Sequence, residues 1–196
     1  MSETVRAFLA VPPDAAWAQS GRELLARVRP DLPEAAWTRP DTWHLTLRFL
    51  GNVPRDSLAR FTAEIGAAAR DLGAVSLLPA GTALFPRHGR PRVLGIGLRD
   101  ETDALRRLAQ QADRAALGIG VAGESRDLHP HVTFARLRRP WPAEAIGRFR
   151  NAVELWNFPV WSVRRLVLYE SRLEPAGPVH RPVGQWNVPA SAETSP

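Results

Sequence analysis

Apolar residues recur along this chain in two rhythms, one typical of helices and one typical of strands. Spacings of three and four residues predict helices over 14–29, 58–72, 102–117 and 143–156. Short apolar runs predict strands over 5–11, 43–50, 75–78, 93–98, 131–137 and 160–169, and a last extended piece that ends at 188. The order lacks the strict alternation of a doubly wound parallel sheet, so we predict an α+β fold with antiparallel pairing.

One short pattern occurs twice, 87 positions apart. His44-Leu45-Thr46-Leu47 lies in one predicted strand and His131-Val132-Thr133-Phe134 in another, and an amphipathic helix follows each copy. This period is too long for a solenoid repeat. It predicts two pseudo-symmetric lobes of antiparallel sheet, with helices on the outside and an active-site cleft between the lobes.

Strand geometry gives each copy a polar face and an apolar face. Residues two apart in a strand point to the same side, so His44 and Thr46 share a face while Leu45 and Leu47 point to the other. Either copy alone is typical of an amphipathic strand whose polar side meets water. Two copies in matching contexts favour a shared function, and we expect both imidazoles to open on one cleft.

Paired imidazoles suit the cleavage of a phosphodiester. A neutral imidazole takes a proton from the attacking water or hydroxyl, and a protonated one gives a proton to the leaving oxygen. Both states coexist near neutral pH because the ordinary pKa is about 6.5. A threonine hydroxyl donates to the phosphate oxygens on which charge builds. The candidate catalytic residues are therefore His44, Thr46, His131 and Thr133.

The residues around both copies extend the match to a known family. The octets 44–51 (HLTLRFLG) and 129–136 (HPHVTFAR) resemble the two signatures of the two-histidine (2H) phosphoesterase superfamily. The likeness is closest to the RNA 2′,3′-cyclic phosphodiesterase (2′-5′ RNA ligase-like) family, and it includes segments 6–8, 85–94 and 167–171. The resemblance implies hydrolysis of a 2′,3′-cyclic phosphate to a 2′-phosphomonoester without cofactors, and also 2′-5′ joining of RNA ends.

The family resemblance also implies roles for single residues. The first histidine, His44, would donate the proton to the departing 3′ oxygen, and His131 would accept the proton of water. Pseudo-symmetry leaves the reverse assignment open. Arg136 and Arg92 match positions of the family pattern and are candidate substrate-binding residues.

Phe49 is a further candidate for substrate binding, as a platform on which a base stacks. Phe49 and Arg136 each lie five residues after a motif histidine, so a regular strand would turn both away from the cleft. Arg136 reaches the phosphate only if the strand ends or bulges first, or if its side chain curls back. The alternatives are a core phenylalanine and a plain surface arginine.

A metal site is the main competing chemistry, because His129 and His131 put two imidazoles on one face. Zinc normally takes three or four protein ligands. Glu124 and Asp127 lie close in sequence but follow no recognisable ligand spacing. We therefore predict no metal site, and the family resemblance implies no cofactor.

Composition adds a partner and a setting. The 196 residues carry a net charge of +6, and every basic residue is arginine, whose planar fork of donors fits phosphate. A genome that favours Arg codons is the plainer explanation of this count, but a positive surface still favours a polyanionic partner. The family resemblance implies that this partner is RNA with a 2′,3′-cyclic phosphate end. The chain has no cysteine, which excludes disulfides and thiolate sites, and no apolar run long enough to cross a membrane.

The residues also set the expected organisation and its alternatives. We expect one cytoplasmic domain over 1–188 with a flexible tail over 189–196, acting as a monomer without an obligate protein partner. Two other functions stay open: a two-histidine enzyme that acts on a small cyclic nucleotide, and an RNA-binding module without catalysis. The second would not need an acid–base pair.

Overall fold

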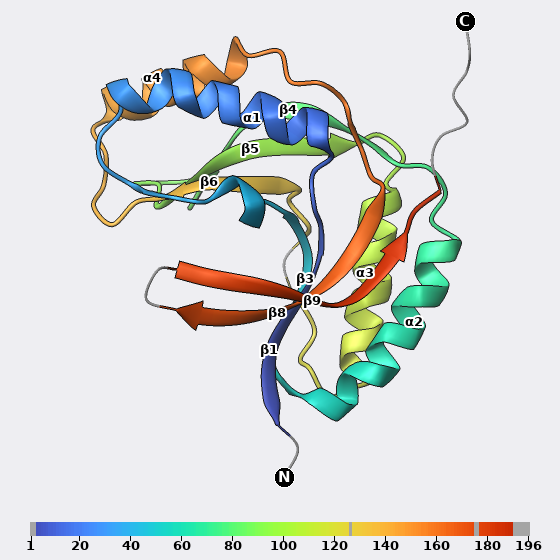
Figure 1. Ribbon diagram of the computed structural model, residues 1–196. Coiled ribbons are helices and arrows are strands. Elements are labelled where there is room, and N and C mark those ends of the chain that lie inside the picture. Colours follow the sequence, from blue (N-terminus) through green and yellow to red (C-terminus); the bar gives the residue numbers. More distant parts are fainter. Residues whose placement is uncertain (1–2, 126, 175–176, 190–196) are drawn as a thin grey trace, which may run out of the picture.

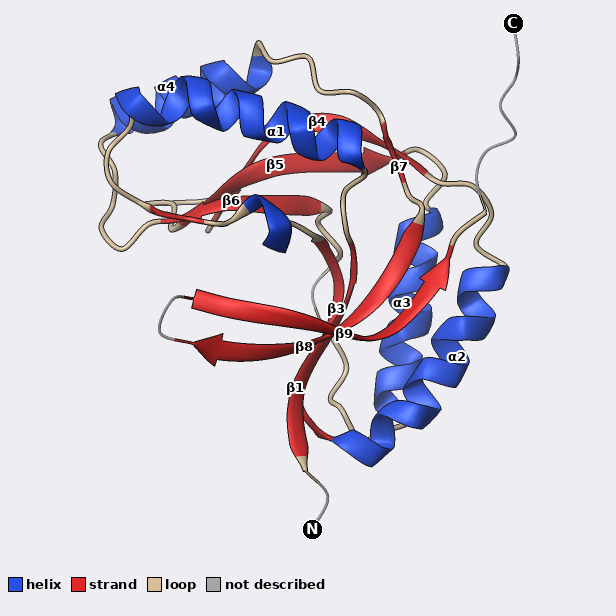
Figure 2. Cartoon of the chain, viewed as in Figure 1, coloured by secondary structure: helices blue, strands red, loops and turns tan. Residues whose placement is uncertain are grey.

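One antiparallel sheet runs through the molecule and is shared by two lobes (Figures 1 and 2). The computed structural model describes residues 3–125, 127–174 and 177–189. Among these residues, nine strands form the order β7-β4-β5-β6-β3-β1-β8-β9, with β2 paired to β6 beside this path. The strands are β1 (Thr4–Val11), β2 (Ala36–Trp37), β3 (Leu45–Pro54), β4 (Ser76–Phe85), β5 (Val93–Asp100), β6 (His131–Arg136), β7 (Trp161–Ser162), β8 (Arg165–Glu174) and β9 (Gly177–Asn187).

Four α-helices cover the outside of the sheet in the described part of the chain. They are α1 (Ala15–Val28), α2 (Leu58–Arg70), α3 (Ala104–Leu117) and α4 (Ala143–Glu154). In Figure 1, α1 and α4 lie over β4, β5 and β6, while α2 and α3 flank β3, β8 and β9. The predicted α+β class, with two antiparallel lobes and outer helices, is confirmed. None of these helices is long and apolar enough to span a membrane.

The two lobes meet where β3 pairs with β6. Within the described residues this contact consists of one pair, Leu45 with Val132, and both side chains are fully buried. Directly behind it, the rings of Trp43 and Phe134 stack with centroids 4.6 Å apart. The lobes are therefore joined by a short backbone contact and an apolar layer beneath it.

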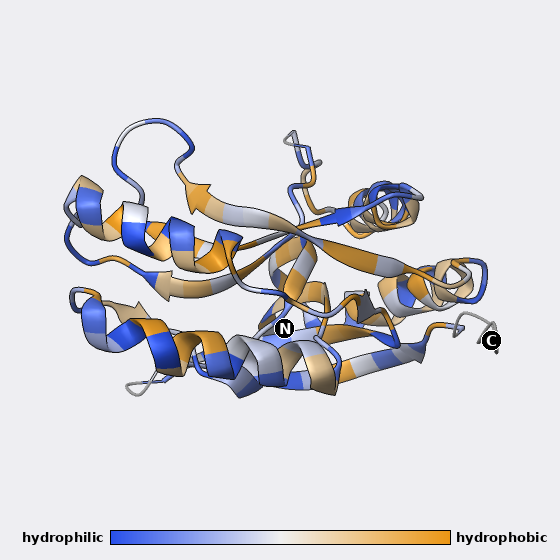
Figure 3. Ribbon diagram, turned by 90° about the horizontal axis from the view of Figure 1, so that it is seen from above, coloured by the Kyte–Doolittle hydropathy of each residue, from blue (hydrophilic) through white to orange (hydrophobic). Residues whose placement is uncertain are grey.

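Helix α1 anchors this layer. The Asp14 carboxylate accepts a hydrogen bond from the Trp17 amide at 2.8 Å and one from the Ser162 amide at 2.9 Å, so it caps α1 and ties it to β7. Trp17 is fully buried and packs its ring against Trp43 and Phe134. Figure 3 shows that the helices carry hydrophobic stretches beside hydrophilic ones, as their position between sheet and solvent requires.

Two strand predictions need correction, and one strand was not predicted. The strand predicted over 75–78 continues to Phe85, because β4 bulges between Pro79 and Thr82 where it is an edge strand that tolerates a proline. The strand predicted over 160–169 is two strands, broken at 163–164. The short strand β2 was not predicted. The tail predicted over 189–196 lies outside the described residues, apart from Pro189.

Gly95 allows the closest approach of backbones within the β5–β6 pair. A methyl group at this position would lie 2.1 Å from the Val132 carbonyl oxygen. We expect Gly95→Ala to lower the free energy of unfolding by about 1 to 3 kcal/mol, because the strands must move apart. Gly147 in α4 has open space around it, so Gly147→Ala should raise stability by up to about 1 kcal/mol. Urea denaturation of both variants checks this, and equal effects of the two would contradict it.

Candidate active site

The pairing of Leu45 with Val132 also sets the arrangement of the four candidate catalytic side chains. In antiparallel strands this pair brings His44 beside Thr133 and Thr46 beside His131, on the sheet face opposite the apolar layer. We call the face that carries these four residues the inner face. The two histidines are diagonal neighbours across the strand pair, and such neighbours have backbones roughly 7 to 8 Å apart. All four side chains are half-buried. The structure thus brings the four residues together.

Both imidazoles are held in the same way. The Nδ1 atom of His44 bonds to the carbonyl oxygen of Thr42, and Nδ1 of His131 bonds to that of His129, each at 2.7 Å. A carbonyl oxygen only accepts, so Nδ1 carries the proton in each ring. When the ring is neutral, Nε2 is left with a free lone pair. The two rings therefore offer equivalent nitrogens for proton transfer.

The two threonine hydroxyls are free to bind a ligand. In the described part of the chain, neither Thr46 nor Thr133 uses its side-chain hydroxyl in a hydrogen bond within the protein. The Thr133 carbonyl oxygen, in contrast, accepts a bond from the Thr38 hydroxyl at 2.7 Å, which fixes the backbone of β6. Each hydroxyl can therefore donate to an oxygen bound between the histidines.

A β-bulge after each His-x-Thr motif brings the next side chains back to the inner face. In β3, Leu47 is the extra residue between the pairs Leu9–Arg48 and Ala10–Thr46. In β6, Phe134 is the extra residue between the pairs Leu94–Ala135 and Gly95–Thr133. A bulge shifts the alternation of side chains by one position. Both bulges fall three residues after the histidine, so they preserve the pseudo-symmetry of the lobes.

Phe49 and Arg136 therefore lie on the inner face despite their offset of five. The Phe49 side chain is 52% exposed, and its ring centroid lies 5.9 Å from that of Phe8, which also packs on His44. Arg136 is exposed and lies close enough to lower the pKa of both His44 and His131. For Arg136 the sequence left three options open: a strand end, a bulge or a curled side chain. The structure contains the bulge.

Arg92 is placed differently. It lies in the bend directly before Val93, the first residue of β5. Its backbone bonds to Phe85 and Leu137, and its side chain is exposed. In the described part of the chain no hydrogen bond or ion pair joins Arg92 to the four motif residues, and its contact with substrate stays a prediction.

His44 is surrounded by aromatic rings that the sequence did not identify as site residues. Ring centroids lie 4.7 Å away for Phe8, 5.4 Å for His180 and 6.4 Å for Tyr169. The alternation of Arg6, Phe8 and Ala10 in β1 could have indicated the face of Phe8. Nothing in the sequence indicated His180, because its position depends on the pairing of β8 with β9.

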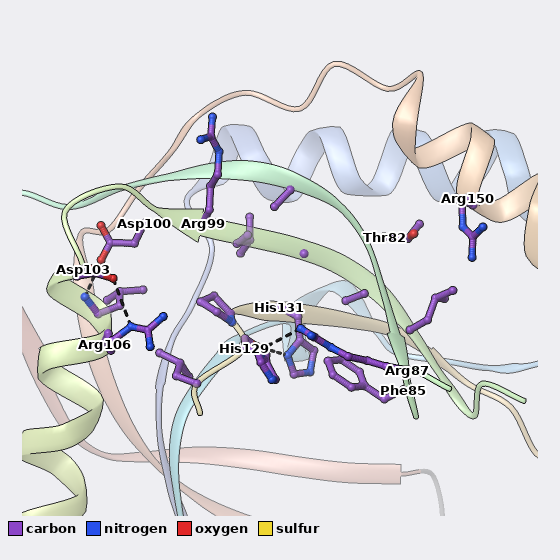
Figure 4. Close-up of a pocket in the computed structure, with 18 residues that line it drawn as sticks. Thr82, Phe85, Arg87, Arg99, Asp100, Asp103, Arg106, His129, His131 and Arg150 are labelled. Carbon is purple, nitrogen blue, oxygen red and sulfur yellow. Dashed lines mark hydrogen bonds and ion pairs between the residues drawn. The ribbon is translucent and has the colours of Figure 1, made fainter. Parts of the chain in front are cut away.

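His131 lines a cavity of about 490 Å³ (Figure 4). Its ring packs on Phe85 at 4.7 Å, and Arg87 reaches His129 at 3.2 Å. The lining residues also include Arg99, Asp100, Asp103 and Arg106, which Figure 4 shows on one side of His131, and Thr82 and Arg150, which it shows on the other. The His131 side of the site is thus open and polar, whereas the His44 side is aromatic.

Burial dominates the electrostatics of the site. It lowers the pKa of His44 to about 4, against the bond to the Thr42 carbonyl, which raises it. His180, His131 and Arg136 lower the pKa of His44 further, since each is or becomes positively charged. Burial also lowers the pKa of His131, and Arg136 acts in the same direction. Both imidazoles are therefore neutral at pH 7 in the free protein.

The fold brings no further metal-binding side chains to His129 and His131 in the described part of the chain. Among the described residues, no group of three or more His, Asp or Glu side chains is arranged to hold a metal ion. The His129 ring bonds to Arg87, and its carbonyl oxygen holds His131. His129 thus acts on the site by orienting its neighbour.

Known proteins share the two-motif organisation of this chain. The family model described as "LigT like Phosphoesterase" matches the chain twice, over residues 11–95 and 96–180, so each match contains one His-x-Thr motif. An RNA 2′,3′-cyclic phosphodiesterase of Archaeoglobus fulgidus is 30% identical over 185 residues, which cover 90% of this chain and 97% of the relative. Another, from Geobacillus stearothermophilus, is 30% identical over 170 residues that cover 85% of this chain. The match spans about half of that relative's length, 52%.

Solved structures carry the same fold. The crystal structure of TT0787 of Thermus thermophilus superposes with a TM-score of 0.79 at 26% identity, and the match covers 95% of this chain and all of that one. Family model, relatives and fold agree over nearly the whole described chain. This protein, which carries one His-x-Thr motif in each lobe, is a member of the LigT-like phosphoesterase family.

Proposed function

We propose that the protein hydrolyses RNA 2′,3′-cyclic phosphate ends to 2′-phosphomonoesters, with His44 and His131 as the acid–base pair. The observation that carries the proposal is the matched pair of imidazoles on one inner face, each with Nδ1 fixed to a carbonyl and Nε2 free. A binding module would not need two equivalent proton-transfer nitrogens. The names of the curated relatives supply the RNA substrate.

The reaction follows from the positions of these groups. The cyclic phosphate binds between the two histidines, with the Thr46 and Thr133 hydroxyls donating to its non-bridging oxygens. His131 Nε2 takes a proton from water as the water oxygen attacks phosphorus. The bond from phosphorus to O3′ breaks on the opposite side, and His44 gives its Nε2 proton to O3′. The 2′-phosphate stays on the ribose, and Arg136 offsets the charge on the phosphoryl oxygens.

The same geometry supports 2′-5′ joining of RNA ends. In that reaction the 5′-hydroxyl of a second RNA replaces water beside His131, and the remaining proton transfers are unchanged. The cavity beside His131 offers room for this second strand next to the phosphate. We include ligation, a monomeric state and a cytoplasmic location in the proposal.

The first prediction of the proposed function concerns the product. Incubation with RNA that ends in a 2′,3′-cyclic phosphate, in the presence of excess chelator, should yield a 2′-phosphate, because O3′ leaves and histidines supply the proton transfers. A phosphatase selective for 3′-phosphates should leave this product intact. Removal of the phosphate by that phosphatase would show that the product carries a 3′-phosphate, so the substrate would bind in the opposite orientation with O2′ as the leaving group. Loss of activity in chelator that added metal restores would favour a metal-dependent hydrolase.

The second prediction concerns the two histidines. His44→Ala and His131→Ala should each lower kcat by about 10² to 10⁴, because each removes one proton-transfer partner. The double variant should be little slower than the slower single variant, since the pair acts as a unit. His88 lies exposed in the 87–92 loop, so His88→Ala is the matched control and should keep the wild-type rate. Near-normal rates in both single variants would refute the proposed pair.

The third prediction concerns pH. The profile of kcat/KM reports the free protein, in which the pKa values of both histidines are lowered, so its optimum should lie below pH 6.5. The phosphate anion favours the imidazolium form and raises the pKa of the acid histidine in the complex. The alkaline limb of kcat should therefore lie at higher pH than that of kcat/KM. Coincident alkaline limbs in the two profiles would contradict this.

Single variants assign the roles by the same measurement. The base histidine must be neutral, so its loss should abolish the acid limb, and loss of the acid histidine should abolish the alkaline limb. With His44 as the acid, His44→Ala keeps only the acid limb. The opposite result would exchange the two roles while leaving the pair intact.

A further inference from the structure

We propose that His180, with Ser171 and Arg6 beside it, forms a second phosphate subsite for the phosphate on the 5′ side of the terminal nucleotide. This rests on the proposed function and goes beyond it, because it gives a reason for the protein to prefer an RNA end over a cyclic mononucleotide. The subsite lies on the inner face of the lobe that carries His44.

Strand register places the three residues in one row across the sheet. His180 in β9 pairs with Ser171 in β8. The pair Ala7–Glu170 joins β1 to β8, and one step further along this register brings Arg6 beside Ser171. Phe8 pairs with Tyr169 on the same face. The row is therefore the next one along the strands from the aromatic rings that pack on His44.

His180 lies beside His44, and its ring makes no hydrogen bond within the described part of the chain. Its ring centroid lies 5.4 Å from that of His44 and 4.9 Å from that of Phe8, with the rings nearly perpendicular in both cases. Its Nδ1 is buried without a hydrogen-bond partner in the described part of the chain. Such a buried atom accommodates a lone pair better than an unpaired N–H. The proton therefore stays on Nε2, which makes the neutral ring a donor.

The charges around His180 favour an anion. Arg39 and Arg6 act on His180 as positive neighbours, Asp41 acts as a negative one, and the neutral His44 ring lies beside it. Asp41 is also paired with Arg39 at 3.3 Å. Burial keeps the His180 ring neutral at pH 7, because it lowers the pKa. A neutral N–H donor beside the Arg6 guanidinium suits a phosphate oxygen and does not exchange protons with it.

The reaction geometry decides which phosphate reaches this row. Water and O3′ occupy opposite sides of phosphorus, so the ribose lies on the side of the acid histidine, His44. The base and the preceding phosphate are attached to that ribose. They therefore extend over the lobe of Phe49, Arg6 and His180, whereas the cavity beside His131 lies on the water side.

The test compares two substrates with the same terminal base. One is a nucleoside 2′,3′-cyclic phosphate, and the other is a dinucleotide ending in that cyclic phosphate, which adds one 5′-side phosphate. The variants are His180→Phe, which keeps the ring and removes the donor, and His180→Gln, which keeps a donor near Nε2. Arg181→Gln is the matched control, since Arg181 is exposed and, as the next residue along β9, points to the other face.

We expect His180→Phe to lower kcat/KM for the dinucleotide by roughly tenfold or more, the loss of one hydrogen bond to a charged group. The mononucleotide lacks this phosphate and should lose far less, so the ratio of the two kcat/KM values should fall, whereas His180→Gln should keep most of the preference for the dinucleotide. Equal losses on both substrates, or no loss on either, would overturn the subsite. A wild-type protein inactive on both substrates would instead overturn the proposed function.

Discussion

The site depends on how closely two strands from different lobes are held together. Leu45 and Val132 form the described backbone contact between β3 and β6, and the Trp43–Phe134 stack supports it from behind. Because residues on either side of this pair alternate between core and inner face, the apolar layer fixes the separation of His44 and His131. Hydrophobic packing thus sets the distance between the two imidazoles. The proposed proton transfers need this distance to leave each imidazole within hydrogen-bond reach of the phosphate ligand.

The paired bulges extend this symmetry beyond the histidines. An ideal strand would carry His-x-Thr on one face and send the fifth residue after each histidine to the other. The extra residues Leu47 and Phe134 cancel that shift and remain in the core themselves. The two lobes then diverge in chemistry at equivalent positions, with an aromatic ring at Phe49 and a positive charge at Arg136. Under the proposed function, Phe49 would face the base and ribose, and Arg136 would face the phosphoryl group.

The sequence allowed prediction of whatever depends on local pattern. The four helices follow from apolar spacing, and the two-lobed fold follows from the repeated motif, since each copy contains its own strand and helix. The bulges were one option among several, because strand sequence alone does not determine which residue lacks a partner. The extension of β4 past Pro79 was missed because it depends on β7 pairing with β4 only at Ser76 and Leu77, which leaves Pro79 without a partner on that side. His180 was missed because it reaches the site only through the register of β8 and β9.

Burial of the acid–base pair makes protonation depend on substrate. With a pKa of about 4 for His44, only about one free molecule in a thousand carries the imidazolium at pH 7. Arg136 adds to this suppression while it also favours an anion between the rings. When the phosphate arrives, its negative charge offsets Arg136 and stabilises a proton on His44 Nε2. The aromatic rings around His44 strengthen that attraction because they exclude water. In the proposed reaction such a site would gain its acid as the anion binds, so part of the binding energy would be used to protonate the group that releases the 3′ oxygen.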